Sequence, residues 1–64
     1  MKCKLKVIMK EEGRTQKWLS EKVGVSMTTI SSIINEKSIP ALPLAFKIAK
    51  TLDRTVEEIW YEEQ

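Results

Sequence analysis

The stretch QKWLSEKVGVSMTTISSIIN, residues 16–35, decides the fold because it holds two short helical patterns on either side of a glycine. Leu19 and Val23 are four residues apart, which puts both side chains on one face of a helix. Gly24 is placed to end that helix, and Ser26 is a good N-cap for the next one. The spacing therefore predicts two short helices joined by a tight turn.

Helical spacing continues through the rest of the chain, and no repeat, linker or low-complexity segment interrupts it. The predicted helices cover about residues 2–12, 16–23, 27–35 and 42–51. Gly13 is placed to end the first, Thr15 caps the second, and a T-x-x-E capping box at Thr55 and Glu58 opens a short fifth. The side chains expected to face inward are Leu5, Ile8, Met9, Leu19, Val23, Ile30, Ile33, Ile34, Leu42, Ala45, Phe46, Ala49, Leu52, Val56, Ile59 and Trp60. The sequence predicts one all-α domain over residues 1–64.

The composition limits the classes of function. A chain of 64 residues has a core of marginal size, so we expect oligomerisation or a very compact helical core. Cys3 is the only cysteine and histidine is missing, which excludes an internal disulfide and a Cys/His zinc site. No apolar run is long enough for a signal peptide or a membrane span, so we expect a cytoplasmic protein with no membrane partner. Without a histidine base or a glycine-rich phosphate loop, we expect no enzymatic activity, no cofactor and no small-molecule ligand.

Charge is distributed unevenly along the chain. Residues 1–24 carry seven Lys/Arg and three Glu, a net charge of +4. Residues 25–50 carry +2, and residues 51–64 carry −4, so the chain has a basic front and an acidic end. This asymmetry favours a polyanionic partner for the basic part, although ordinary solvated charge would explain it equally well.

The predicted helix that follows Gly24 has an unusual exposed face. Its isoleucines form one stripe, and the opposite face carries Thr28, Ser32 and Asn35, flanked by Met27, Thr29 and Ser31. Residues 25–35 contain no charge, whereas 31% of the chain is charged. A face that enters the major groove must lack carboxylates and carry short side chains that allow close approach. DNA reading is one interpretation; coverage by another subunit or by another part of the chain is the alternative.

The motif spacing resembles a helix-turn-helix. Counted from Gln16, the motif has apolar residues at places four, ten, fifteen and eighteen, a small residue at place five and glycine at place nine; these are Leu19, Val25, Ile30, Ile33, Ser20 and Gly24. With Gly13, Pro40, LPLAFKIAKTLD and the TVEEIW ending, nearly the whole chain is similar to the Cro/cI-type (XRE) family of small DNA-binding regulators. The resemblance implies a compact five-helix, lambda-repressor-like domain.

The resemblance also implies roles for individual residues. The base-reading positions correspond to Met27, Thr28 and Ser32, with Ser31 and Thr29 as auxiliaries. Gln16 and the loop of Asn35, Lys37 and Ser38 correspond to phosphate-binding positions, to which Lys17 and Arg14 are plausible additions, although ordinary solvated lysines remain the alternative. Trp18 is expected either to cover the edge of the first helix or to contact the DNA backbone.

The resemblance implies double-stranded DNA as the partner, with a homodimer bound to a pseudopalindromic operator. It also implies a prokaryotic or phage regulator that acts as a repressor. Leu44, Ile48 and Tyr61 are the residues expected in the dimer interface. A protein-interaction module, such as an antitoxin-type regulator, is the alternative function.

The chain departs from the family pattern in three ways. The reading face has no Gln, Arg or Asn for two-point contacts to purines at its reading positions, so we expect weak direct readout and a preference for A·T-containing half-sites. Met9 and Ile34 stand where many relatives pair an arginine with a glutamate, so an apolar contact is expected. Glu36 stands where a glycine is often found after the third helix.

Overall fold

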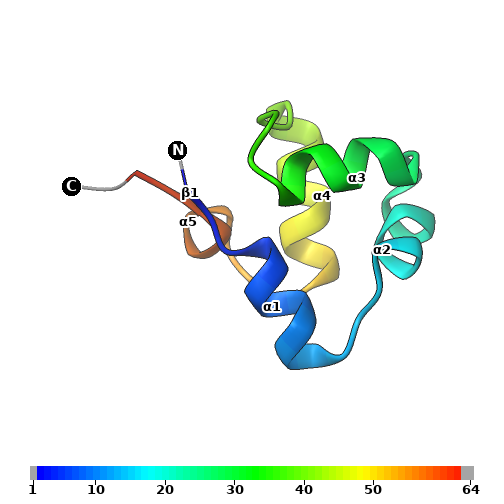
Figure 1. The fold of residues 1–64 in the computed structure, drawn as a ribbon. Coiled ribbons are helices and arrows are strands. Elements are labelled where there is room, and N and C mark those ends of the chain that lie inside the picture. The colour runs from blue at the N-terminus through cyan, green and yellow to red at the C-terminus, as the bar shows by residue number, and fades with distance from the viewer. Residues whose placement is uncertain (1, 63–64) are drawn as a thin grey trace.

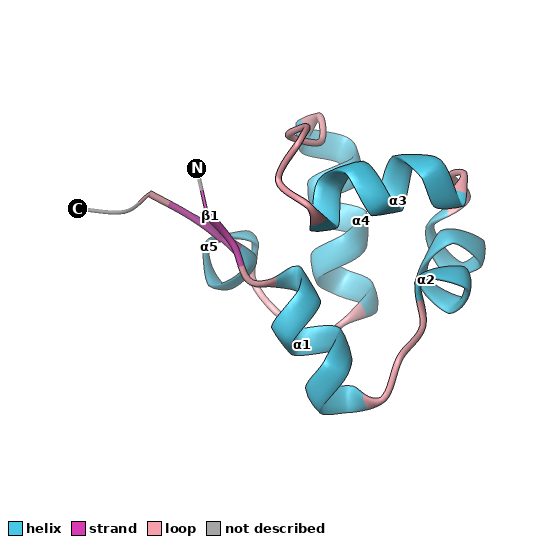
Figure 2. Cartoon of the chain, in the orientation of Figure 1, coloured by secondary structure: helices cyan, strands magenta, loops and turns pink. Residues whose placement is uncertain are grey.

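The computed structural model describes residues 2–62, which form helices and a short two-stranded ribbon (Figures 1 and 2). The elements in chain order are β1 (Lys2–Cys3), α1 (Leu5–Glu12), α2 (Gln16–Val23), α3 (Met27–Ile34), α4 (Leu42–Thr51), α5 (Val56–Ile59) and β2 (Trp60–Tyr61). In Figure 1, α3 crosses in front of α4, and α2 stands beside both. The five predicted helices are confirmed.

The predicted starts of α2, α3 and α5 are confirmed by their cap hydrogen bonds. The Trp18 amide donates to the Thr15 hydroxyl (3.0 Å) at the start of α2. The Thr29 amide donates to the Ser26 hydroxyl (3.2 Å) at the start of α3. At α5 the Glu58 amide donates to Thr55 Oγ1 (3.2 Å) while the Thr55 amide donates to the Glu58 carboxylate (3.0 Å), which completes the capping box.

Four residues in the left-handed region follow the helices, and sequence analysis found only the two glycines. Gly13 and Gly24 have φ angles of 67° and 75°. Glu36 (φ 61°) and Asp53 (φ 57°) adopt the same conformation although they carry side chains. After α3 the Lys37 amide donates to the Ser32 carbonyl (2.9 Å) and the Glu36 amide to the Ile33 carbonyl (3.1 Å), which is a Schellman motif. Glu36 thus provides the turn that a glycine would provide.

The two ends of the described chain correct the all-α prediction. Residues 2–3 do not extend α1 but pair antiparallel with β2, with Lys2 opposite Tyr61 and Cys3 opposite Trp60. Figure 2 shows these strands side by side although they lie at opposite ends of the sequence. Trp60 is buried, as predicted, but it belongs to a strand and not to the fifth helix. The pairing joins residues almost 60 positions apart, which no local pattern can indicate.

The predicted inward face of α4 is wrong in part. Leu42 and Phe46 are 62% and 55% exposed, whereas Ile48 is completely buried and Leu44 is partly buried against the core. The buried stripe of the helix is Ala45, Ile48, Ala49 and, just beyond its end, Leu52. These positions recur at i, i+3, i+4 and i+7, so they form one face of the helix as well as the predicted set does. The small side chains of the two alanines allow α4 to pack closely against its neighbours.

The core lies where the inward faces of the helices meet. Leu5, Leu19, Ile30, Ile33, Ile48 and Ile59 are its largest fully buried side chains. Met9 and Ile34 are both buried in the same cluster, in agreement with the apolar contact expected there. Because Ile30, Ile33 and Ile34 anchor α3 in the core, its opposite face is held toward solvent.

Candidate nucleic-acid interface

A shallow depression of about 330 Å³ runs along the exposed face of α3. Its lining comes from three parts of the chain: the start of α2, the face of α3 and the loop after α3. The residues are Gln16, Met27, Thr28, Ser31, Ser32, Asn35 and Lys37. All of them are residues that sequence analysis assigned to DNA bases or phosphates. The fold therefore brings four of the predicted reading positions together with three predicted phosphate contacts, at Gln16, Asn35 and Lys37.

The depression has the chemistry expected of a surface that contacts an anionic partner. Among the described residues that line it, none is acidic and one, Lys37, is basic. Met27 is 49% exposed, so its thioether is available for apolar contact, for example with a thymine methyl group. The Asn35 side-chain amide donates to the Ser31 hydroxyl (3.3 Å), which holds both side chains and leaves the Ser31 proton free to donate.

The remaining predicted contact residues lie outside this depression. The Thr29 hydroxyl is 3.0 Å from the Ser26 hydroxyl, so Thr29 takes part in the cap of α3. Lys17 and Ser38 are exposed but do not line the depression. Arg14 lines a neighbouring hollow at the start of α2.

The turn between α2 and α3 is held by hydrogen bonds around the buried Ser20. Ser20 is buried at the place where the motif requires a small residue, and its hydroxyl donates to the Lys17 carbonyl (2.9 Å). The amides of Gly24 and Val25 both donate to the Ser20 carbonyl (2.9 and 3.1 Å). These bonds close α2 and set the direction in which α3 leaves the turn.

Trp18 covers the edge of the core. It is partly buried and packs against the core, and the Arg14 guanidinium lies 4.4 Å from the centre of its ring. The stacking holds Arg14 beside the start of α2. Both roles expected for Trp18, at the edge of the first helix or at the DNA backbone, stay predictions.

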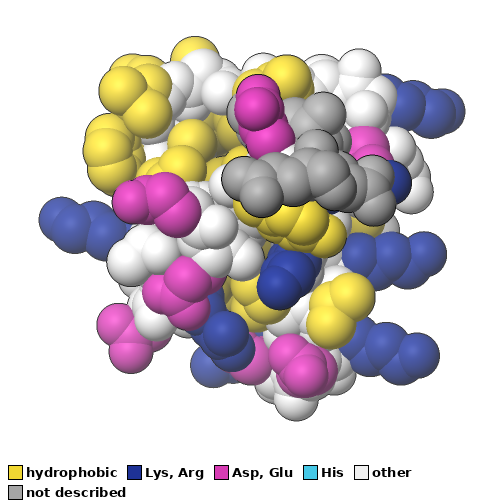
Figure 3. Space-filling model, turned by 90° about the vertical axis from the view of Figure 1, so that its left-hand side faces the viewer, with side chains coloured by type: hydrophobic (Ala, Val, Ile, Leu, Met, Phe, Trp, Pro, Cys, Tyr) yellow, Lys and Arg dark blue, Asp and Glu magenta, His cyan; other side chains and the backbone are white. Residues whose placement is uncertain are grey.

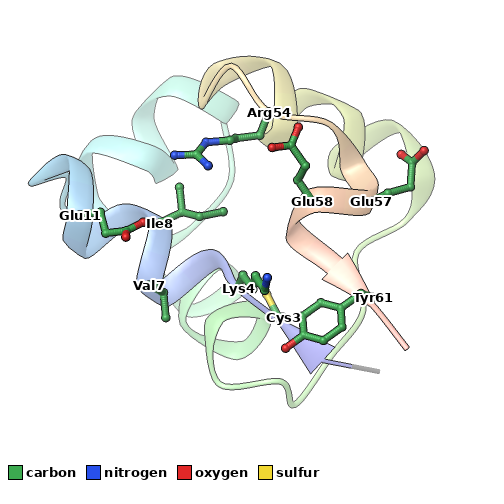
Figure 4. Close-up of a pocket in the computed structure, with 9 residues that line it drawn as sticks. All are labelled: Cys3, Lys4, Val7, Ile8, Glu11, Arg54, Glu57, Glu58 and Tyr61. Carbon is green, nitrogen blue, oxygen red and sulfur yellow. The ribbon is translucent and has the colours of Figure 1, made fainter. Parts of the chain in front are cut away.

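A separate hollow of about 580 Å³ lies between α1, α5 and β2, away from the α3 face (Figure 4). Burial raises the pKa of the Cys3 thiol, so this group is a poorer nucleophile than an exposed cysteine. Hydrogen bonds from Thr55 lower the pKa of Glu58, which is engaged in the capping box. Across residues 2–62, no group of three or more His, Cys, Asp and Glu is placed to bind a metal ion. The hollow holds no arrangement typical of catalysis.

The residues predicted for a dimer interface have different environments. Ile48 is completely buried inside its own chain, so it cannot contact a second one, and that part of the prediction is wrong. Leu44 is partly buried, and Tyr61 is exposed with the Lys4 ammonium 5.2 Å from its ring centre (Figure 4).

No helix within residues 2–62 has the length and apolar character needed to cross a bilayer.

Comparison with known proteins agrees with this geometry. The family model described as Helix-turn-helix matches residues 5–59. Two similar proteins are uncharacterised transcriptional regulators of the helix-turn-helix type. The one from Methanocaldococcus jannaschii is 44% identical over 98% of this chain and 96% of its own length. The one from Bacillus subtilis is 37% identical over 100% of this chain and 98% of its own length.

A solved structure shows the same fold. The crystal structure of a proposed DNA-binding protein from Bacteroides fragilis has a TM-score of 0.83 and 34% identity, and the match covers 91% of this chain and 94% of that one. The fold and the turn geometry define a helix-turn-helix domain. The chain belongs to the XRE-type helix-turn-helix family, which is a family of DNA-binding transcriptional regulators and not of enzymes.

Proposed function

We propose that this protein regulates transcription by binding double-stranded DNA in a sequence-specific way, with α3 in the major groove. The observation that carries the proposal is the depression along α3, where hydroxyl, amide and thioether groups gather without an acidic side chain. An exposed helix face normally carries charged residues, so an uncharged one beside a lysine needs another explanation. Close approach of DNA, which repels carboxylates, supplies it.

The roles of the contact residues follow from their positions in the depression. Thr28 and Ser32 lie one turn apart on α3 and offer hydroxyl groups to base edges, and Met27 offers an apolar surface to a thymine methyl group. Gln16 at the start of α2 and Lys37 after α3 bind phosphates on the two sides of the groove. Lys17, Arg14 and Ser38 provide further phosphate contacts around this centre.

The expected specificity is modest for each contact. A hydroxyl forms a single hydrogen bond, whereas a guanidinium or carboxamide can bind a purine at two points. Sequence preference therefore depends in part on DNA shape, and we propose half-sites that contain A·T pairs. Two copies bind the halves of a pseudopalindromic operator, and occupation of that operator represses transcription.

The test is a binding-site selection followed by fluorescence anisotropy on the selected duplex and on a scrambled one. Thr28→Ala/Ser32→Ala should reduce the preference for the selected duplex roughly 30-fold, because two hydrogen bonds of about 1 kcal/mol each are lost. Lys37→Ala should weaken binding to both duplexes and reduce the salt dependence of binding. Lys50→Ala is the matched control, since Lys50 is exposed on α4 and lines no part of the depression.

Two results would contradict the proposal. If wild-type protein binds every duplex equally and only through salt-dependent attraction, α3 reads no sequence, and the role as a protein-interaction module gains support. A selected site with a G-rich core would contradict the proposed A·T preference alone.

A further inference from the structure

A second depression adjoins the one along α3. It has a volume of about 360 Å³ and is lined by Lys6, Met9, Lys10, Arg14, Gln16, Ile34 and Asn35. Gln16 and Asn35 line both depressions, so the two are neighbours along one continuous surface. This surface extends the proposed DNA-binding face from α3 onto α1.

The second depression carries positive charge that no nearby acid neutralises. Its buried floor is formed by Met9 and Ile34, and its rim carries Lys6, Lys10 and Arg14. Within residues 2–62, no carboxylate is ion-paired with any of these three cations, whereas Arg54 is paired with Glu12 (3.4 Å). In Figure 3, basic side chains project one above another from the right-hand edge and also lie at the left edge and the lower centre, and most of the acidic side chains lie at the left and the bottom.

Helix stability accounts for only part of this arrangement, because Lys10 lies in the last turn of α1, where a cation is favourable, whereas Lys6 does not. Lys6 and Lys10 are four residues apart on α1, where like charges repel and weaken the helix. Arg14 is held in place by its stacking on Trp18. An anionic ligand beside Lys6 and Lys10 would offset the repulsion between them. The neighbouring face of α3, for which DNA binding is proposed, indicates that this ligand is the DNA backbone.

We infer that Lys6 and Lys10, together with Arg14, bind the DNA phosphates that flank the segment contacted by α3. The inference rests on the proposed function and adds to it a second backbone contact, made by α1. Four residues of helix rise about 6 Å, so the two ammonium groups lie far enough apart to bind different phosphates. The lysines of α1 therefore extend the contacted DNA backbone beyond the segment that α3 contacts.

The experiment compares two variants that remove the same charge. Lys6→Gln/Lys10→Gln removes the proposed contacts, and Lys47→Gln/Lys50→Gln removes two exposed lysines of α4, which line a different hollow. Affinity for the selected duplex is measured across a salt series. In the α1 variant, the plot of log K against log salt should be less steep by about 1.8, because each of the two lost phosphate contacts contributes about 0.9 to the slope. Its preference for the selected over the scrambled duplex should be unchanged.

A shorter duplex provides the second readout. When the flanking base pairs are removed, wild-type protein should lose the same part of the salt slope, and the α1 variant should lose nothing more. Equal effects of the α1 and α4 variants on the slope would overturn the inference while leaving the proposed function intact. Failure of the proposed function is seen separately, with wild-type protein alone, as a lack of preference between the selected and scrambled duplexes.

Discussion

The environment of α4 leads to a sharp prediction, because two of its large apolar residues exchange the roles that the sequence suggests. Ile48 is completely buried and Phe46 is 55% exposed. Truncation of a buried isoleucine to alanine costs about 2–5 kcal/mol, since transfer free energy is lost and a cavity remains. Removal of a phenylalanine that is only half buried should cost about 1 kcal/mol, from roughly half of its burial energy. Ile48→Ala should therefore destabilise the protein at least twice as much as Phe46→Ala.

Urea unfolding followed by tryptophan fluorescence measures the difference, since Trp60 is buried and its emission changes when the core opens. A domain of this size has a free energy of unfolding of about 3–10 kcal/mol, and a slope near 1 kcal/mol per molar urea. Ile48→Ala should lower the midpoint by about 3 M and Phe46→Ala by about 1 M or less.

A milder pair keeps the comparison valid if Ile48→Ala does not fold. Ile48→Val should cost about 0.5–1.5 kcal/mol, and Phe46→Leu should cost about 0.5 kcal/mol or less. A larger loss of stability from the Phe46 substitutions than from the Ile48 substitutions would mean that α4 packs through its other stripe, and would refute the assigned core.

Three further effects are expected. Gly24→Ala should cost about 1–2 kcal/mol in urea unfolding, because the backbone has a φ of 75° while a Cβ at this position would meet nothing within 4 Å; no loss would contradict the left-handed turn. Glu58→Gln should lower the melting temperature at pH 7, because the lowered pKa of Glu58 stabilises the fold while its carboxylate is charged. This effect should begin to shrink near the unfolded pKa of about 4.3 and disappear as the pH falls through the folded pKa, so an equal effect at pH 7 and at strongly acidic pH would exclude the charge as its cause. Cys3 should react with a thiol reagent at pH 8 more slowly in the folded than in the urea-unfolded protein, because burial raises its pKa; equal rates would show that the thiol is not shielded.

Much of α3 and its surroundings was predictable because the signals are local. Thr15, Ser26 and Thr55 each accept a backbone hydrogen bond from a residue three positions later, so the cap and its partner lie within one turn. The isoleucine stripe of α3 was equally clear, since no second apolar stripe competes with it. Once that stripe is buried, helical geometry alone places Thr28 and Ser32 on the exposed face.

The basic side chains at the rim of the second depression, Lys6, Lys10 and Arg14, could not be recognised from local sequence signals. Lys6 and Lys10 occur in a segment that is lysine-rich throughout, and nothing in their spacing distinguishes them from solvated lysines. The phosphate-binding role proposed for these lysines depends on their position beside the exposed face of α3. Gln16 and Asn35 line both depressions and so connect the lysines of α1 with that face. That neighbourhood exists only after the helices have packed.

By itself, then, the sequence determined the helices, their caps, the turn at Gly24 and the uncharged face of α3, because each depends on residues less than about two turns apart. Tertiary structure alone decided which stripe of α4 is buried and the pairing of β1 with β2. On α4 the predicted and the observed stripe share Ala45, Ala49 and Leu52 and satisfy the helical period equally well. Only packing against the neighbouring helices buries Ile48 and leaves Leu42 and Phe46 exposed. Strand pairing across the whole chain likewise requires a folded core to bring its partners together.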